Sequence, residues 1–433
     1  MNNIKEKIKE MYTFILLWAT QSFSALGSAM TSYALVIWSY EKQGSALVTS
    51  LLMVSSYAPY VILSIFAGAL SDRWNKKIVM LISDSIAALG TIIIFILLES
   101  GSLQVWHLYI LNAVNGFMNT IQQPASEVAI TGILPKKYYQ KVGGIRYFSS
   151  AVNSILTPII ATAFMSIAGI KIVITFDLFT FIFAFVTLLF FIKIPEESVV
   201  GDKKEGILQS AYIGINYLKK NRGILDLILF LAAINFTASI YQAVFPVMIL
   251  SRNGGSEKAL GIVNTVIGIT TLIGSIIASF VKTPKSRVRV ICNSLLFSMS
   301  FNNFFLAFGQ SIWIWCFGAF LGWITIPLMS TNLEAILRLK IPKEIQGRVY
   351  SVRNSFQYFT IPMGYLLGGI FVDKVFEPIM TIQGADSLLV KLFGSGKGSG
   401  AAFLFFIIAF IGVLTCFFFR YDKNIWKLEE KKD

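Results

Sequence analysis

Apolar segments of about 20 residues recur along nearly the whole chain, and they limit its possible folds more than any other feature. A helix of that length crosses a hydrocarbon core of roughly 30 Å. Only 14% of the 433 residues are charged, against about 25% in typical soluble domains. The sequence therefore predicts an all-α membrane protein with twelve transmembrane helices. Their expected ranges are 13–39, 46–70, 77–98, 104–131, 141–168, 171–193, 223–250, 258–281, 288–309, 311–339, 351–374 and 400–420.

The distribution of Lys and Arg predicts the orientation of these helices. With the N-terminus in the cytoplasm, 30 of the 37 basic residues fall in the N-terminal segment and the loops on that side. Such an excess marks the cytoplasmic face of a membrane protein. We therefore expect a multi-pass protein of the plasma membrane with both termini in the cytoplasm. The net charge of +14 follows from this topology and requires no nucleic-acid partner.

Two stretches of the chain match at a constant offset of 207 residues, which indicates an internal duplication. Each lies between the fourth and fifth expected helices of its half. The identical pairs are Glu127 and Glu334, Pro135 and Pro342, Lys136 and Lys343, Val142 and Val349, and Arg146 and Arg353. We predict two six-helix halves, 1–193 and 223–433, joined by a cytoplasmic linker, 194–222. Its second part, 207–220, is amphipathic and is expected to lie on the membrane surface. The glycine-rich stretch 375–399 is interpreted as a flexible loop.

A charged turn joins the second and third expected helices. It combines a glycine, an acid and basic residues, and the residues we single out are Gly68, Asp72, Arg73 and Lys77. The glycine permits close helix contact, and the basic residues anchor the turn to one face of the bilayer. Ser279 stands where the duplication predicts a second acid. We therefore interpret the turn as a conformational latch, in which Asp72 accepts hydrogen bonds from the start of the eleventh helix, near 351–355.

The sequence of this turn, Gly68-Ala69-Leu70-Ser71-Asp72-Arg73-Trp74-Asn75-Lys76-Lys77, resembles the signature turn of the major facilitator superfamily. Within it, the chain resembles the drug/proton antiporter branch that includes macrolide-efflux proteins and enterobactin exporters. The further matching residues are Gln21-Ser22, Gly27-Ser28, Gly44-Ser45-Ala46, Asp84, Gln123-Pro124-Ala125, Leu134-Pro135 and Phe176-Asp177. The resemblance implies efflux of an amphipathic small molecule by alternating access, driven by protons.

Four acidic residues within the expected helices are candidates for function, because ionisable groups are costly there. Glu127 and Glu334 each precede an arginine by 19 residues, Arg146 and Arg353, and antiparallel neighbouring helices would pair them. We expect these ion pairs to be structural or to form part of a gate. Asp84 and Asp177 are the candidates for proton coupling. The resemblance places the third and sixth helices at the periphery, away from the cavity.

Polar residues at helical spacing predict the lining of a substrate cavity. Steps of three and four residues place them on one face of a helix, and such a face is costly against lipid. The candidates are Gln21, Ser24, Ser28 and the adjacent Thr31 in the first helix, Asn112, Asn115, Asn119 and Gln122 in the fourth, Asn235, Ser239 and Gln242 in the seventh, and Trp323 and Asn332 in the tenth. Hydrogen bonding between helices is the alternative interpretation.

Other classes of function lack support in the sequence. There is no Gly-x-x-x-x-Gly-Lys-Ser/Thr loop for nucleotides, one histidine, and three cysteines without metal-ligand spacing. We therefore expect no enzyme activity, cofactor or metal, and we expect a monomer in the lipid bilayer whose partners are an amphipathic substrate and protons. Three alternatives stay open: export of a siderophore or other endogenous metabolite, lipid flipping, and a non-transporting membrane receptor.

Overall fold

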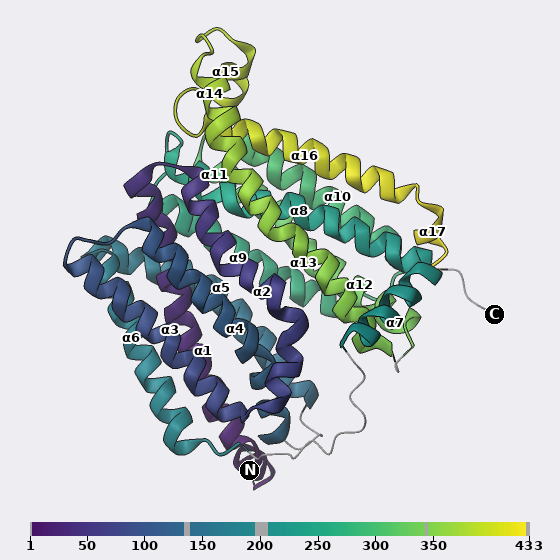
Figure 1. The fold of residues 1–433 in the computed structure, drawn as a ribbon. Coiled ribbons are helices and arrows are strands. Elements are labelled where there is room, and N and C mark those ends of the chain that lie inside the picture. The colour runs from purple at the N-terminus through teal and green to yellow at the C-terminus, as the bar shows by residue number, and fades with distance from the viewer. Residues whose placement is uncertain (1, 134–138, 195–206, 343–344, 430–433) are drawn as a thin grey trace. The chain divides into compact units, whose positions relative to one another are not determined.

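The computed structural model describes the backbone of residues 2–133, 139–194, 207–342 and 345–429. The side chains of 2–10, 64–73, 131, 139–144, 147, 207–211, 347 and 351 are not part of this description. The chain divides into two units: residues 1–39 with 55–204 form unit 1, and residues 40–54 with 205–433 form unit 2. Every regular element within the described ranges is a helix (Figure 1).

Unit 1 is built from six long helices. They are α1 (Asn2–Gln43), α2 (Ala46–Arg73), α3 (Lys76–Glu99), α4 (Val105–Ile133), α5 (Tyr139–Ala168) and α6 (Ile170–Val186), which continues into the π-helical turn η2 (Thr187–Phe191). The last four residues of α1 and the start of α2, within 40–54, group with unit 2. α3 packs against α4 and α6, and Leu26 and Met30 of α1 form a core with Ala161 of α5 and Val173 of α6.

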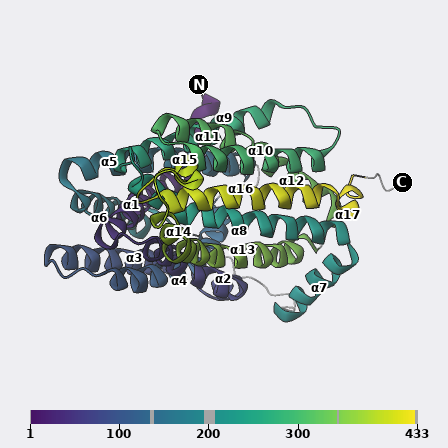
Figure 2. The same ribbon diagram turned by 90° about the horizontal axis from the view of Figure 1, so that it is seen from above.

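Unit 2 contains the remaining helices. They are α7 (Ile207–Lys220), α8 (Arg222–Ser251), α9 (Glu257–Phe280), α10 (Arg287–Phe308), α11 (Ile312–Ile324), α12 (Ile326–Lys340), α13 (Gln346–Ile370) with the π-helical turn η4 (Phe371–Phe376), α14 (Glu377–Thr381), α15 (Leu388–Phe393), α16 (Ser399–Arg420) and α17 (Lys423–Trp426). Figure 2 shows α16 between α10 and α8, with α13 beside α8, in agreement with the helix contacts.

Local sequence explains where several helices begin. The side chain of Asn75 accepts a hydrogen bond from the amide of Ile78 at 3.1 Å and starts α3. Ser256 and Ser286 do the same for α9 and α10. These side chains satisfy amide groups that have no partner within the helix, which stabilises a helix start by about 1 kcal/mol.

The tenth expected helix, 311–339, agrees with one candidate span, Ile312–Lys340. This span is interrupted at Thr325, between α11 and α12, because Pro327 has no amide hydrogen to continue the helical ladder. The expectation of a loop is wrong in part. The stretch 375–399 is not a loop throughout, since it contains α14 and α15, which project from the ends of α13 and α16 (Figure 1). The amphipathic segment 207–220 does form a helix with those bounds, α7.

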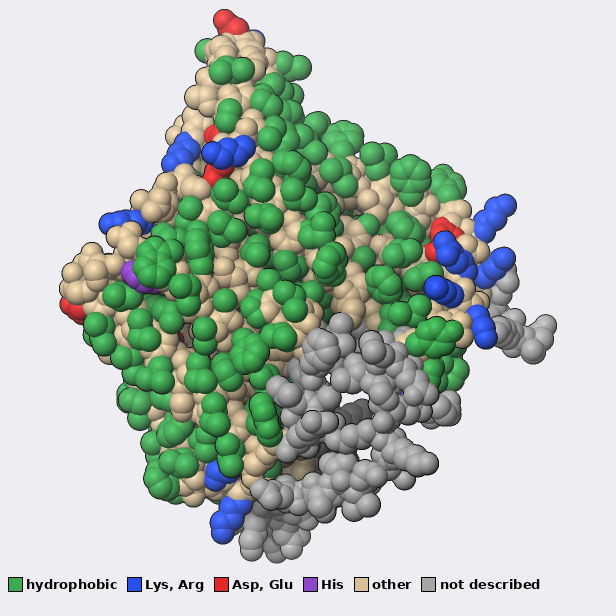
Figure 3. Space-filling model, viewed as in Figure 1, with side chains coloured by type: hydrophobic (Ala, Val, Ile, Leu, Met, Phe, Trp, Pro, Cys, Tyr) green, Lys and Arg blue, Asp and Glu red, His purple; other side chains and the backbone are tan. Residues whose placement is uncertain are grey.

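The helices carry the surface expected of a membrane protein. In the described part of the chain, ten helices are long and apolar enough to cross a bilayer. α1 and α4 are not among them, because polar side chains interrupt their apolar sequence. On α6, Phe179, Ile182, Phe183 and Val186 form an exposed stripe, which is suited to lipid. The face shown in Figure 3 is largely hydrophobic, with Lys and Arg mainly near helix ends.

Candidate functional site

A polar cavity of about 330 Å³ lies within unit 1, and we call it the Asp84 cavity. Its volume corresponds to about ten water molecules. Helices α1, α2, α3, α4 and α6 provide its walls. Its polar lining consists of Gln21, Ser24, Ser28, Thr31, Ser32, Ser56, Asp84, Thr91, Asn112, Asn115, Asn119, Gln122 and Asp177.

The polar faces predicted for α1 and α4 come together in this cavity. All four residues predicted on α4 line it, as do Gln21, Ser24 and Ser28 of α1. The helical spacing was therefore a reliable guide to which side chains share a face. Whether these residues contact a substrate stays a prediction.

Asp84 lies two turns into α3 and accepts one hydrogen bond on each carboxylate oxygen. The amide of Gln122 donates to Oδ1 at 2.5 Å, and the amide of Gln21 donates to Oδ2 at 3.2 Å. Both donors come from neighbouring helices of the unit, so the carboxylate joins α3 to α4 and α1. The expectation that this acid lies away from the cavity is wrong, because α3 presents Asp84 to the polar faces of α1 and α4.

Asp177 lines the same cavity from α6 and is only 4% exposed. Its Oδ1 accepts a hydrogen bond from the hydroxyl of Ser28 at 3.0 Å. Gly27 allows α6 to approach α1 here, because an added Cβ would lie 2.3 Å from Oγ1 of Thr180. The peripheral position expected for Asp177 is therefore also wrong.

The two acids occupy different levels of the membrane-spanning unit. Asp84 contacts Gln21, whereas Asp177 contacts Ser28, which lies seven residues further along α1. Seven residues of helix correspond to about 10 Å. One cavity with a largely polar lining thus contains both carboxyl groups.

The charge of the cavity is unbalanced. Among the described residues, its lining contains two carboxyl groups and no Lys, Arg or His. Ionised carboxylates without a basic partner are costly in a membrane-spanning segment, and the cost falls when a proton or another cation neutralises them. The cavity is therefore suited to the uptake and release of cations.

The predicted cavity residues of unit 2 have varied surroundings. Asn235 is partly buried, and the hydroxyl of Ser239 donates to its carbonyl at 2.6 Å. An added Cβ at Gly364 of α13 would lie 2.2 Å from Oγ of Ser239. Ser239 therefore packs at the contact between α8 and α13, and its place in a substrate cavity stays a prediction.

The other three side chains from this prediction make polar or aromatic contacts within unit 2. Gln242 is exposed and accepts a hydrogen bond from the hydroxyl of Tyr365 at 2.9 Å. Trp323 lies beside Tyr241, with ring centroids 6.4 Å apart. Asn332 is buried and donates to the carbonyl of Leu328 in its own helix, so this bond is not one between helices.

Both predicted ion pairs are present. Arg146 pairs with Glu127 at 2.5 Å in unit 1, and Arg353 pairs with Glu334 at 3.0 Å in unit 2. The duplicated sequence thus produces the same contact in each unit. The second pair is less exposed, because the side chain of Arg353 is 15% exposed against 40% for Arg146.

The charged turn is described only in part. Gly68 and the side chains of Asp72 and Arg73 lie outside the part of the chain whose side chains are described. The ammonium of Lys77 donates to the carbonyls of Leu189 and Ile192 at 2.9 and 2.7 Å. Lys77 therefore satisfies the carbonyl end of η2, where a cation is favoured, and this contact holds α3 to α6.

Sequence reasoning missed several features that the structure contains. Ser56 and Thr91 line the Asp84 cavity, although neither belongs to a polar stripe that would single it out. Asp373 lies at the end of the eleventh expected helix, and Glu377 follows it by four residues. Both accept hydrogen bonds from amides at the start of other helices, and their spacing of one helical turn was the available signal. Within the described residues, no cluster of His, Cys, Asp and Glu is arranged to hold a metal ion.

Long apolar helices in two units, with a buried polar cavity in one of them, define a polytopic α-helical transporter. The chain belongs to the Major Facilitator Superfamily, whose family model matches residues 17–364.

Known relatives agree with this family. The chain is 24% identical to macrolide efflux protein A of Streptococcus pyogenes over 369 residues, covering 84% of this chain and 90% of the relative. It is 23% identical to macrolide efflux protein A of Enterococcus faecalis over 328 residues, covering 74% of this chain and 99% of the relative. The chain is thus similar to transporters of the macrolide-efflux type.

Solved structures support the fold. A bacterial homologue of the human lysosomal transporter Spinster superposes with a TM-score of 0.68 at 13% identity, covering 98% of this chain and 99% of that one. The nucleoside transporter NupG gives a TM-score of 0.65 at 13% identity, covering 94% and 99%. At this identity the likeness concerns the fold alone.

Proposed function

We propose that the protein is a secondary active exporter of amphipathic small molecules of the macrolide or drug-like class, coupled to protons. The observation that carries this proposal is the Asp84 cavity, in which polar faces of two helices surround two acids without a basic partner. The macrolide-efflux relatives supply the substrate class. Export would proceed by alternating access in the plasma membrane, with both termini in the cytoplasm.

Proton coupling requires a group whose charge changes during the cycle, and Asp84 is our first candidate. Both of its oxygens accept hydrogen bonds from amide donors on neighbouring helices, so protonation would weaken the links from α3 to α1 and α4. Asp177 is the second candidate, and its hydrogen bond with Ser28 connects α6 to α1. Exchange of protons at these acids would thus change the packing of one unit.

Conformational switching is assigned to the charges near the expected cytoplasmic ends of the helices. We propose that the Glu127–Arg146 and Glu334–Arg353 pairs break or change partners during the cycle. Asp72 is proposed to act as the latch, with Gly68 and Arg73 shaping its turn. Substitution of Asp72 by Asn should slow or bias switching, and an unchanged transport rate would contradict the latch.

Transport by purified protein in liposomes tests the proposal directly. Radiolabelled erythromycin should accumulate in vesicles with an acidic lumen, and a protonophore should abolish the accumulation. Protein-free liposomes correct for passive trapping of a weak base. Accumulation no greater than in protein-free vesicles would contradict macrolide antiport. Accumulation above the protein-free level that does not depend on the pH gradient would contradict proton coupling but not macrolide export. Movement of lipid without ion dependence would favour lipid flipping.

A further inference from the structure

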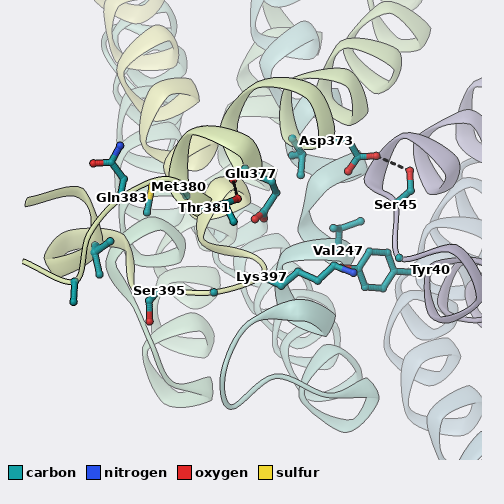
Figure 4. Close-up of a pocket in the computed structure, with 15 residues that line it drawn as sticks. Tyr40, Ser45, Val247, Asp373, Glu377, Met380, Thr381, Gln383, Ser395 and Lys397 are labelled. Atoms are coloured by element: carbon teal, nitrogen blue, oxygen red, sulfur yellow. Dashed lines mark hydrogen bonds between the residues drawn. The ribbon is translucent and has the colours of Figure 1, made fainter. Parts of the chain in front are cut away.

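A second pocket, of about 740 Å³, lies in unit 2, and we call it the Tyr40 pocket (Figure 4). It is lined by the end of α1, the two residues before α2, α8, η4, α14, α15 and the segments before and after α15. Tyr40, Val247, Val372 and Met380 provide apolar surface, while Glu377 and Lys397 provide charge. Its size falls within the range of about 300–1,000 Å³ typical of small-molecule sites. This is more than twice the volume of the Asp84 cavity.

Two acids fix one side of this pocket by capping helices. Asp373 accepts from the hydroxyl of Ser45 at 2.5 Å and from the amides of Ala46 and Leu47 at 3.0 and 2.9 Å, so it caps α2. One helical turn later, Glu377 accepts from the amide of Gly398 at 2.8 Å, next to the start of α16. Their carboxylates are held in place by backbone donors and not by a basic side chain.

Lys397 places an ammonium group in this pocket. Its Nζ lies 5.5 Å from the ring centroid of Tyr40, within the range of a cation–π interaction, and Figure 4 shows the side chain extended toward this ring. Glu377 attracts the same ammonium electrostatically. Gly44, with φ of +62°, leaves the space that the ammonium uses, because an added Cβ would lie 2.6 Å from Nζ.

The arrangement has the parts of a cation site, and a side chain of the chain itself occupies it. The aromatic face belongs to a buried tyrosine, 7% exposed, and is therefore fixed. Lys397 is exposed and lies between Gly396 and Gly398, both with positive φ. Its flexible stem allows it to leave at little cost. Without Lys397, the pocket would present two carboxylates and the face of Tyr40 to an incoming ligand.

We propose that the Tyr40 pocket binds a lipophilic organic cation, whose positive centre displaces the ammonium of Lys397 from the face of Tyr40. The apolar surface of Val247, Val372 and Met380 would receive the lipophilic part of the ligand. Lys397 then acts as an internal competitor, which lowers the apparent affinity in proportion to the time it occupies the site. This site shares no lining residue with the Asp84 cavity, and binding to it requires neither substrate efflux nor a proton gradient.

Binding of radiolabelled tetraphenylphosphonium to the full-length protein in nanodiscs tests this proposal. Lys397→Met keeps the length of the side chain but removes the charge, and it should raise the affinity about threefold to tenfold. Tyr40→Leu should lower the affinity at least about twofold, and Lys397→Arg should stay near the wild type. Lys391→Met, an exposed lysine on α15 outside the pocket lining, is the matched control.

Tetraphenylborate, which has nearly the same shape and the opposite charge, separates charge recognition from nonspecific partition. Its binding should fall or stay constant in Lys397→Met. A parallel rise for both ions, an unchanged affinity for tetraphenylphosphonium in Lys397→Met, or wild-type affinity in Tyr40→Leu would each overturn the proposal. Thermal midpoints of the variants identify any loss of folding. None of these results depends on whether erythromycin is transported.

Discussion

Arg353 donates a hydrogen bond to Glu334 at 3.0 Å, and the two residues lie 19 positions apart on α13 and α12. The same contact joins Arg146 to Glu127, 207 residues earlier in the chain. The two copies of the duplicated sequence therefore share the same ion pair between two helices, as well as the same residue types. The pair in unit 2 is better shielded, since Arg353 is 15% exposed.

The difference in exposure predicts unequal effects of mutation. Glu334→Gln should destabilise the protein by about 1 kcal/mol, and Glu127→Gln by less, because exposed ion pairs contribute little. Thermal unfolding of the purified variants checks this order. The swapped variant Glu334→Arg/Arg353→Glu should recover part of the loss, and equal losses for both single variants would contradict the ranking.

Replacing Asp84 by a neutral side chain should abolish the coupling of drug transport to the proton gradient without abolishing transport itself. Asp84→Asn keeps a side chain able to bond with Gln21 and Gln122, so the fold should persist. Gradient-driven accumulation of erythromycin should fall at least about fivefold, whereas exchange of labelled for unlabelled drug without a gradient should continue. Asp177→Asn should give a smaller loss. Asp386→Asn, an exposed acid, is the control. Full gradient-driven accumulation in Asp84→Asn would exclude it as the coupling group.

Arg252 should contribute strongly to the stability of unit 2. Its buried guanidinium donates to the carbonyls of Leu306 and Ala307 at 2.9 and 3.2 Å and to Phe393 at 2.8 Å. These carbonyls lie at the ends of α10 and α15, where a cation is favoured. Burial lowers the pKa of Arg252 to about 10, so the group remains charged at neutral pH.

Removal of this side chain would leave the three carbonyls without their donor. Arg252→Met should therefore cost about 3 kcal/mol, and Arg252→Lys less, because lysine keeps the charge but lacks the planar fork. Thermal unfolding measures both. Lys258→Met, on the exposed surface of α9, should have little effect. A small loss for Arg252→Met would show that water replaces the guanidinium.

Asp373 should control local order at the start of α2. Asp373→Ala removes the acceptor for the amides of Ala46 and Leu47, which should destabilise this helix start by about 1–2 kcal/mol. Hydrogen exchange should become faster at the first turn of α2 and stay unchanged in α9. Ser45→Ala removes the hydroxyl that accepts from one amide, that of Val48 at 3.2 Å, and leaves both acceptors on Asp373, so its effect should be smaller. Unchanged exchange in Asp373→Ala would contradict the role of Asp373 as a cap.

Sequence patterns predicted local features of this protein better than contacts between distant segments. The stripe from Asn112 to Gln122 was predictable, because helical periodicity alone decides which side chains share a face. The position of Asp84 was not, since it depends on how α3 packs against α1 and α4. The packing of Ser239 was not predictable either, because a hydroxyl within a helix can bond to its own backbone and then pack against Gly364. The break at Thr325 had a local signal in Pro327, which the apolar pattern concealed.

The stripe on α4 provides the sharpest test of substrate contact. Asn115 lines the Asp84 cavity, whereas Phe117 of the same helix is 41% exposed and does not line it. Asn115→Leu should change the relative transport rates of a compound panel by about tenfold, because a polar partner is replaced by an apolar side chain of similar size. Phe117→Leu should leave these ratios unchanged. If Asn115→Leu instead prevents membrane insertion while Phe117→Leu inserts normally, the stripe serves helix packing and the substrate is recognised elsewhere.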